Sequence, residues 1–345
     1  MDILDCIRNP FGLGPEATIS PLGNGHINET RLVRDGSRRL VAQRINTTVF
    51  SRPSKLVENA RLIESHLAAV PGAPRVVRHL SGKDGSFLFG PQGNVRVLEY
   101  IPGTRCLEVL ENPAQARRAA VSFGSFSRCM QGIDPGDLDI VIPDFHGPAI
   151  RWSQFMATLE RDRAGRSGDC PEEVAFALDH ERDVLGWQEL MGGLPLRICH
   201  NDCKINNLLV HRDSGESIAI IDLDTCMPGR VLTDFGDLVR SCSSPEPEDS
   251  TRLERITARP PVYRALLEGY LEGWQGGLEK DERDSLLQGA LMMCFILGLR
   301  FLGDFIDGDR YFSVARPWHN LERARNQFQL FRSLVKQREM FAGLA

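Results

Sequence analysis

The sequence predicts an α+β protein with two lobes, a small mixed N-terminal lobe and a larger, mostly helical C-terminal lobe. Three observations support this prediction. Strand-like segments gather before residue 101 and surround a single helical pattern. A Pro-Gly pair at 102–103 then breaks the chain, and helical spacing of apolar residues prevails from 105 onward. The length of 345 residues also suits two lobes better than one small core.

The N-terminal lobe is expected to hold its strands around a glycine turn. "ISPLGNGHINETRLV" (19–33) places Gly-Asn-Gly between two β-like segments, and "RRLVAQRI" (38–45) is a third strand. "SKLVENARLIESHLAAV" (54–70) has apolar residues at helical spacing. "GSFLFG" (85–90) and "VRVLEYI" (95–101) are predicted to form a hairpin. This lobe therefore combines several strands with one helix.

The C-terminal lobe is expected to be helical, with one short β region. Its first three helices are predicted at 112–133, 149–165 and 171–191. Asn112 is a suitable cap for the first of them because Pro113 follows it. A β region is expected at 196–225, and helices return from 234 after it, interrupted by a polar loop at 243–250. The predicted boundaries are 1–98 for the N-terminal lobe, 99–103 for a hinge and 104–345 for the C-terminal lobe.

Composition narrows the class of protein. The chain is 42% hydrophobic and 25% charged, with a formal net charge of −5, which argues against a nucleic-acid-binding surface. The apolar stretch 286–303 contains Gln288 and Arg300, so we interpret it as a buried helix and not as a membrane span. The N-terminus has no signal-peptide pattern. Nine cysteines without a C-x-x-C pair indicate reduced thiols in a cytoplasmic protein, and the sequence does not specify an oligomeric state.

Polar residues gather around two short apolar segments in the β region. "HNDCKINN" precedes the predicted strand 208–211, and "DLD" ends the predicted strand 217–221. A polar turn joins the two strands, so a hairpin would bring the two polar ends together. We therefore expect Asp202, Asn207 and Asp222 to lie at one rigid edge.

This residue set suits phosphoryl transfer from a nucleotide. Magnesium takes oxygen ligands, often few from the protein and the rest from phosphates and water, and Asn207 and Asp222 could supply such ligands. Asp202 could then orient and deprotonate an attacking hydroxyl. The arrangement is H-x-D-x-x-x-x-N followed by a magnesium-binding Asp. The alternative is a polar turn that only caps a hairpin.

With these motifs, the chain resembles the kinase-like small-molecule phosphotransferases, which include aminoglycoside phosphotransferases and choline kinases. Within that group it is most similar to the N-acetylhexosamine 1-kinases. The matching stretches span nearly the whole chain: "GNGHINET" (23–30), "VAQRINTTVF" (41–50), "VIPDFH" (141–146), "HNDCKINNLL" (200–209), "IDLDTCMPG" (221–229), "DFGDLVR" (234–240), "RFLGDFIDGDRYF" (300–312) and "HNLERARNQFQL" (319–330).

The resemblance implies a protein-kinase-like bilobal fold that uses ATP and Mg²⁺. Asp202 corresponds to the catalytic base, and Asn207 and Asp222 correspond to the magnesium ligands. Other residues would bind the nucleotide. The phosphates would lie under Gly23, Asn24 and Gly25, and the adenine would bind the backbone of Glu99, Tyr100 and Ile101.

The predicted third strand departs from the kinase pattern because its phosphate-binding lysine is absent. Gln43 and Arg44 are the available replacements, and strand alternation puts them on opposite faces. Arg44 is favoured because a guanidinium binds phosphate oxygens in a fork. Its partner on the helix would be Glu58, or less favourably Glu64. The alternative for Glu64 is a position on the solvent-exposed face of the helix, without a functional role.

"DFGD" (234–237) resembles the magnesium-binding motif of protein kinases but follows "IDLD" and opens a helix. Asp234 is therefore expected to cap that helix, and Asp237 to brace the catalytic loop.

The acceptor site is predicted less directly. His26 and Asn28, just beyond the glycine turn, could reach a sugar hydroxyl. Arg300, Asp304 and Tyr311 could form the rest of the site, although Arg300 and Asp304 could instead be a structural ion pair at i, i+4. Tyr311 and Trp318 could stack on a sugar or simply pack, and the role of His146 is left open.

The function expected is transfer of the γ-phosphoryl group of ATP to the anomeric hydroxyl of an N-acetylhexosamine. The partners are thus ATP and a small molecule, with no nucleic acid and no membrane. One alternative is a kinase for another small alcohol, such as an aminoglycoside, choline, homoserine or a different sugar. The other is a non-catalytic nucleotide-binding regulator.

Overall fold

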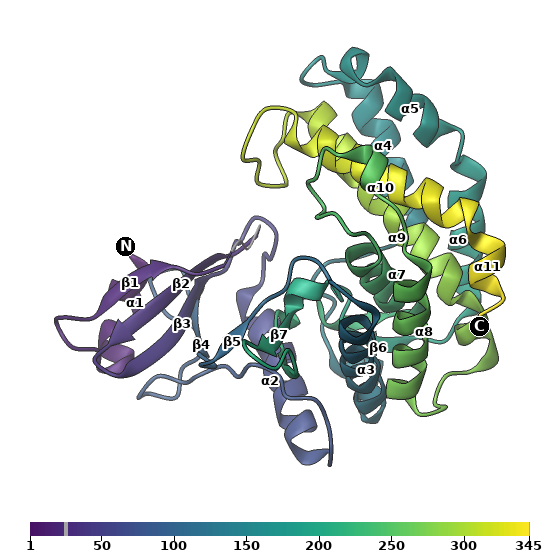
Figure 1. Ribbon diagram of the computed structural model, residues 1–345. Helices are drawn as coiled ribbons and strands as arrows, with labels where there is room; N and C mark the ends of the chain where they lie inside the picture. Colours follow the sequence, from purple (N-terminus) through teal and green to yellow (C-terminus); the bar gives the residue numbers. More distant parts are fainter. Residues whose placement is uncertain (24–26, 345) are drawn as a thin grey trace.

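The structure of the protein, a computed structural model, describes residues 1–23 and 27–344. Two lobes lie side by side, the N-terminal lobe at the left of Figure 1 and the helical C-terminal lobe at the right. The predicted two-lobed α+β class is confirmed.

The N-terminal lobe is built on a four-stranded antiparallel sheet. Its strands follow in the order β1 (Thr18–Pro21), β2 (Glu29–Asp35), β3 (Arg38–Arg44) and β4 (Val95–Glu99). Helix α1 (Ile3–Phe11) packs its apolar side chains against one face of this sheet. Helix α2 (Pro53–Ala69) matches the predicted helix and buries Ile63 and Leu67 in the core of the C-terminal lobe.

Two features of this lobe differ from the prediction. Residues 85–90 form no strand, because Gly85 and Gly90 both take left-handed turn conformations with φ of 82°, and only Phe89 bridges to Val95. Strand β4 pairs with β3 instead. Helix α1 lies outside the predicted elements.

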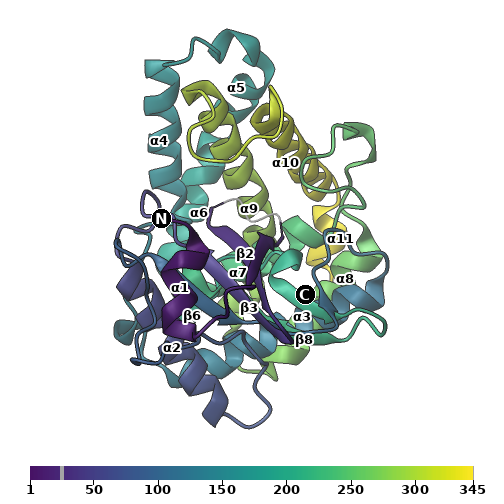
Figure 2. The same cartoon turned by 90° about the vertical axis from the view of Figure 1, so that its left-hand side faces the viewer.

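The C-terminal lobe is helical around a few short strands. Its helices are α3 (Pro113–Cys129), α4 (Pro148–Arg161), α5 (Pro171–Leu178), α6 (Glu181–Gly193), α7 (Val231–Cys242), α8 (Pro260–Trp274), α9 (Lys280–Asp307), α10 (His319–Lys336) and α11 (Arg338–Ala342). Its strands are β5 (Thr104–Arg105), β6 (Arg197–Cys199), β7 (Leu208–His211), β8 (Ser217–Ile220) and β9 (Met227–Gly229). Viewed from the N-terminal lobe, α4 and α10 extend above the sheet and α1 (Figure 2).

The caps and breaks of these helices follow local sequence. Asn112 caps α3 as predicted, since its side chain accepts a hydrogen bond from the backbone N–H of Gln115 at 3.0 Å. The single helix predicted at 171–191 is instead two helices, α5 and α6, which break at residues 179–180.

Helix α9 is the core helix of the C-terminal lobe. It is long and apolar enough to cross a membrane, but 83% of its most apolar window is buried inside the protein, as predicted for 286–303. Gly289 of α9 and Gly236 of α7 let the two helices touch backbone to backbone. A Cβ on Gly289 would lie only 2.1 Å from the carbonyl oxygen of Leu232, which shows how close this crossing is.

A backbone seam joins the two lobes along residues 75–80. Ile220 of β8 donates its N–H to the carbonyl of Arg75 at 2.8 Å, and Val77 donates to Ile220 at 3.2 Å. Further along the same segment, Leu80 donates to Val97 of β4 at 2.8 Å. One short segment is therefore hydrogen-bonded both to the N-terminal sheet and to the hairpin of the C-terminal lobe.

The α7–α9 crossing gives a test of the core. Gly289→Ala should lower the free energy of unfolding by about 1–3 kcal/mol, because the added methyl must push α7 away. Thermal unfolding of the purified variant measures this. Gly186→Ala in α6 is the matched control: its Cβ would meet nothing within 4 Å, so equal or higher stability is expected. An unchanged melting temperature in Gly289→Ala would contradict the close crossing.

Candidate active site

The hairpin of β7 and β8 joins the two polar ends that the sequence singles out. The strands pair antiparallel, and Ile221 donates its backbone N–H to the carbonyl of Asn207 at 2.9 Å. His200 Nε2 lies 3.1 Å from the carbonyl oxygen of Ile221. Asp222 follows directly, so it is held beside the segment that carries Asp202 and Asn207.

Asp202 is fixed by two donors from its own loop. Lys204 Nζ donates to its Oδ2 at 2.7 Å, and Asn207 Nδ2 donates to the same oxygen at 2.8 Å. Burial alone would raise the pKa of Asp202, but the charge and hydrogen bond of Lys204 outweigh it and lower the pKa to about 2. The side chain still exposes 22% of its surface, so its second oxygen can face a ligand.

The loop that carries Asp202 is held by Asp234. The carboxylate of Asp234 accepts the backbone N–H groups of His200 at 2.9 Å and Asn201 at 2.7 Å. Burial raises the pKa of Asp234 to about 6. Asn201 has a positive φ of 59°, a conformation that the two hydrogen bonds help to maintain.

"DFGD" is thus structural, but neither acid has the role that the sequence predicts for it. Asp234 lies inside α7, whose N-cap is Arg230, so it is the brace of the catalytic loop and not a helix cap. Asp237 pairs with Arg240 of the same helix at 2.7 Å, and Arg240 also pairs with Glu248.

Asp222 is the one acid of this centre for which the described residues provide no hydrogen bond or ion pair. The Asp222 residue is solvent-exposed, but the protein packed around it, and then the negative charge of Asp224, raise its pKa to about 7. The Nδ2 group of Asn207 is taken up by Asp202, which leaves its Oδ1 to act as an acceptor or ligand. A solvent-exposed carboxylate without a partner among the described residues, beside an amide oxygen, is a donor set that fits a hard cation.

The protein would supply few ligands to such a cation. Across residues 1–23 and 27–344, no group of three or more His, Cys, Asp or Glu is arranged to hold a metal. Magnesium takes few ligands from the protein because water and phosphate oxygens supply the others, so Asn207 and Asp222 would suffice to hold it.

Asp224, two residues after Asp222, pairs with a cation that the sequence analysis did not identify. Arg96 of β4 reaches it through both terminal nitrogens, at 2.6 and 2.7 Å. Asn28 Nδ2 donates to the same carboxylate at 2.7 Å, and Asn28 Oδ1 accepts the N–H of Asn46. Asn28 therefore has structural partners on both ends of its amide, in contrast to the sugar contact predicted for it.

The structure also places Arg44 far from the predicted nucleotide site. Gln43 and Arg44 lie on opposite faces of β3 as predicted, but Gln43 accepts a hydrogen bond from Arg96, whereas Arg44 donates to the carbonyl of Met1 and pairs with Glu29 at 3.4 Å. Arg44 thus lies on the α1 side of the sheet, away from Asp222. The sequence does contain a signal for Arg96. Strand alternation in "VRVLE" puts this charged residue on the other face of the sheet from the two buried valines.

The glutamates of α2 also differ from the prediction. Glu58 is exposed and pairs with Lys55 at 2.8 Å. Glu64 is largely buried and lies 2.6 Å from Nδ1 of His79, so it is not on a solvated face. Of the two, only Glu64 points toward the lobe interface.

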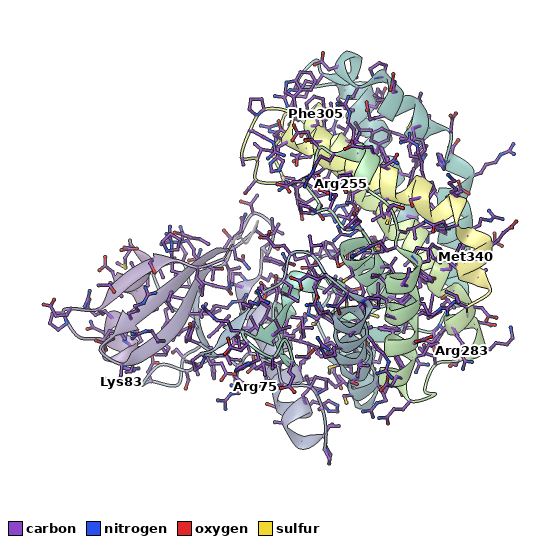
Figure 3. All side chains as sticks on the ribbon, in the orientation of Figure 1. Arg75, Lys83, Arg255, Arg283, Phe305 and Met340 are labelled. Atoms are coloured by element: carbon purple, nitrogen blue, oxygen red, sulfur yellow. The ribbon has the colours of Figure 1, made fainter. Side chains whose placement is uncertain are left out.

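The predicted hinge follows β4. The Glu99 carboxylate accepts hydrogen bonds from Arg75 at 2.8 Å and from the backbone N–H of Arg78 at 3.1 Å. Arg75 lies near the junction of the lobes (Figure 3). Among the described residues the N–H groups of Tyr100 and Ile101 donate to no protein acceptor, so both remain available to a ligand.

Part of the predicted glycine loop lies outside the described residues. This applies to Asn24, Gly25 and His26. Gly23 is exposed and has a positive φ of 70°, a conformation that suits glycine.

Arg300 lies among aromatic rings near Asp202. Its guanidinium is 5.2 Å from the ring centre of Phe145, 5.5 Å from Tyr311 and 5.3 Å from Phe312. Burial lowers the pKa of Arg300, and the phenol of Tyr311 and the carboxylate of Asp202 are close enough to oppose that shift. Arg300 and Tyr311 also line a cavity of about 170 Å³.

Asp304 is not the partner of Arg300. Its carboxylate accepts the backbone N–H groups of Arg310, Tyr311 and Phe312 at 2.8–2.9 Å, together with Asn320 Nδ2. Asp304 therefore holds the loop that presents Tyr311 and also lines the cavity, while the alternative ion pair with Arg300 is not formed among the described residues.

Two further residues support the centre. His146 Nε2 lies 2.7 Å from the carbonyl oxygen of Asn201, and burial lowers its pKa to about 3, so it is a neutral support of the catalytic loop. Lys204, to which the sequence analysis assigned no role, lies beside Asp202, and the charges of Asp202 and Asp222 raise its pKa.

The geometry agrees with comparison to known proteins. Residues 18–280 match the model of the phosphotransferase enzyme family. The chain belongs to this family. That match covers well over half of the chain and includes both lobes, so the protein is a phosphotransferase with the protein-kinase-like fold.

Solved structures share this fold across nearly the whole chain. A microcompartment-associated aminopropanol kinase has a TM-score of 0.66 at 16% identity, with 97% of each chain covered. A choline/ethanolamine kinase family protein from Mesorhizobium loti has a TM-score of 0.56 at 18% identity, covering 96% of this chain and 92% of that one. A spectinomycin phosphotransferase in complex with ADP and spectinomycin has a TM-score of 0.53 at 13% identity, covering 94% and 97%.

The role of Asp304 gives a prediction that is independent of catalysis. Asp304→Ala leaves three backbone N–H groups without their acceptor, which should cost about 1–3 kcal/mol and loosen the loop around 308–318. Limited proteolysis should then cut this loop faster. Asp307→Ala is the control, since Asp307 only faces Arg163 at 3.7 Å and should leave the cleavage rate unchanged. Equal cleavage of both variants would show that Asp304 does not hold the loop.

Proposed function

We propose that the protein transfers the γ-phosphoryl group of ATP, with Mg²⁺, to a hydroxyl group of a small molecule. The observation that carries this proposal is that two carboxylates lie together at the open end of one hairpin. Asp202 is oriented by hydrogen bonds, and Asp222 has no partner among the described residues. The family match and the ADP bound to a relative of the same fold support a nucleotide as donor.

The nucleotide has a suitable surface on the N-terminal sheet. Leu32, Val41 and Leu98 lie side by side in register on the face opposite α1. This apolar strip would cover the adenine. The free N–H groups of Tyr100 and Ile101 would donate hydrogen bonds to its ring nitrogens. Gly23 begins the loop that would approach the phosphates.

The residues of the hairpin then perform the transfer. Asp222 and Asn207 would hold Mg²⁺, which when bound neutralises phosphate charge and orients the phosphates. Lys204 holds Asp202 in place and adds positive charge on the side where the phosphoryl group arrives. Because Asp202 has a low pKa, it acts chiefly by orienting the acceptor hydroxyl and receives the proton late in the transfer. Catalysis therefore rests on positioning and charge neutralisation.

Charge at the acceptor end argues against a cationic acceptor. Arg151 and Arg300 line the 170 Å³ cavity, and within the part of the chain that the structure describes neither forms an ion pair. Two carboxylates also line it, but Asp304 is occupied by backbone N–H groups and Asp307 faces an arginine. The arginines and carboxylates that line the cavity thus balance in charge, which gives a cation such as choline or an aminoglycoside no surplus of carboxylates to bind.

The acidic loop 243–250 does not change this balance. Each of its carboxylates already has an arginine partner: Glu246 pairs with Arg252 and Arg255, Glu248 with Arg240, and Asp249 with Arg316. The remaining acceptor class is neutral and rich in hydrogen-bonding oxygens. We therefore favour a sugar, and specifically the anomeric hydroxyl of an N-acetylhexosamine, with Arg300 and Tyr311 as contacts. The nine free cysteines are compatible with a cytoplasmic enzyme.

The catalytic role of Asp202 has a direct test. Asp202→Asn should reduce kcat by about 10²–10⁴, because the amide keeps the shape of the side chain but cannot accept the proton. Magnesium-ATP binding, measured by calorimetry, should change little. Wild-type turnover in this variant would remove Asp202 from the mechanism, and a wild-type protein that binds ATP without consuming it would favour the regulator alternative.

The acceptor is tested by a panel of sugars and amino alcohols with identification of the product. N-acetylhexosamines should give the 1-phosphate, and their methyl glycosides should be inert because the attacking oxygen is blocked. Arg300→Ala should raise the KM for the sugar far more than the KM for ATP. A panel in which choline or an aminoglycoside reacts fastest would reject the sugar assignment while leaving the phosphotransferase intact.

A further inference from the structure

A chain of four polar side chains crosses from α2 to the segment that carries Asp222. Glu64 of α2 lies 2.6 Å from Nδ1 of His79, and Nε2 of the same ring lies 3.4 Å from Arg96. Arg96 then pairs with Asp224 through both terminal nitrogens. The chain connects the helix and sheet of the N-terminal lobe with the turn after β8.

Arg96 is the central member of this chain. Its side chain is 2% exposed and that of Asp224 is 3% exposed, so both charges are removed from water and depend on each other. Its remaining nitrogen, Nε, donates to Gln43 at 3.0 Å, and the two residues are direct partners in the β3–β4 register. All three nitrogens of this guanidinium therefore have a partner.

The same arrangement sets the position of Asp222. Asp224 follows Asp222 by two residues, and the intervening turn is a single 3₁₀ turn that starts from a left-handed Asp222. Moving Asp224 would consequently move Asp222. Kinases generally place an N-lobe cation, supported by a glutamate on the adjacent helix, against the nucleotide-binding segment. In this chain position 43 is a neutral glutamine that itself bonds to Arg96.

We propose that Arg96 is the positioning residue that replaces the missing strand lysine: it anchors Asp224 to the N-terminal sheet and so aligns Asp222 with the nucleotide phosphates. Glu64 and His79 hold the guanidinium from behind, as the glutamate of a lysine–glutamate pair would. The inference rests on the nucleotide and magnesium site proposed above but is independent of which acceptor is used.

A merely structural salt bridge would behave differently under substitution. A structural role predicts loss of stability with unchanged kinetic constants in the fraction that remains folded. A positioning role predicts a selective effect on the nucleotide, because only Asp222 and its metal are displaced. The kinetics of folded variants therefore separate the two.

The first experiment compares Arg96→Gln with wild type at saturating acceptor. The KM for magnesium-ATP should rise and kcat should fall, together by about 10–100-fold in kcat/KM, as for other residues that orient a metal ligand. The KM for the acceptor should stay within a factor of about two, well below the change for ATP. Arg39→Gln on β3 is the charge control, since that guanidinium donates only to backbone carbonyls of the neighbouring turn.

The second experiment is a rescue, and it also covers the case in which Arg96→Gln folds poorly. Adding Gln43→Lys to Arg96→Gln places a cation on the paired strand position, next to the side chain of residue 96 and within one long side chain's reach of the carboxylate that Arg96 binds. Recovery of the ATP KM toward the wild-type value is expected in the double variant, and Arg96→Lys should retain more ATP affinity than Arg96→Gln.

The possible outcomes are distinct. Wild-type ATP kinetics in folded Arg96→Gln, or a loss of ATP affinity in Arg44→Gln in its place, would overturn the proposal. Equal rises in the KM for ATP and for the acceptor, without rescue by Gln43→Lys, would also overturn it. If the wild-type protein itself neither binds nor consumes magnesium-ATP, the proposed function fails, and this result is seen before any variant is made.

Discussion

The backbone hydrogen bond from Ile221 to Asn207 is the constraint on which the centre depends. It closes the open end of the β7–β8 hairpin and so puts two acidic turns, distant in sequence, next to each other. His200 and Asp234 then fix the loop on one side of this bond, and Arg96 fixes the turn on the other. Each of these contacts is useful only because the hairpin has already placed its two ends together.

Gathering so many carboxylates in one buried region requires a separate partner for each. Asp202 has Lys204, Asp224 has Arg96, Asp237 has Arg240, and Asp234 has two backbone N–H groups. No two of these four acids depend on the same partner. Among these acids Asp222 alone has no partner in the described residues and is open to solvent, so it is the one that could bind a cation supplied with the substrate.

How much of this centre the sequence could predict depends on how far apart in the sequence the interacting residues lie. Asp202, Asn207 and Asp222 could be brought together from local pattern, because two apolar strands with polar ends imply a hairpin. The roles of Asn28, Arg44 and Asp304 depend on partners 10 to 200 residues away or on loop backbone, which no local spacing reveals. Arg96 is an intermediate case, since alternation in its strand shows that it faces away from the core but does not name Asp224.

The seam at residues 75–80 has a mechanical consequence. Its hydrogen bonds to β8 on one side and to β4 on the other, together with the β5–β7 pairing that follows the hinge, make the catalytic hairpin an extension of the N-terminal sheet. A closing movement that preserves these hydrogen bonds must carry the hairpin together with the N-terminal lobe. The Ile221–Asn207 bond and the contact of His200 Nε2 with Ile221 tie the loop of Asp202 to the same hairpin, so Asp202 and Asp222 would keep their spacing during such a movement.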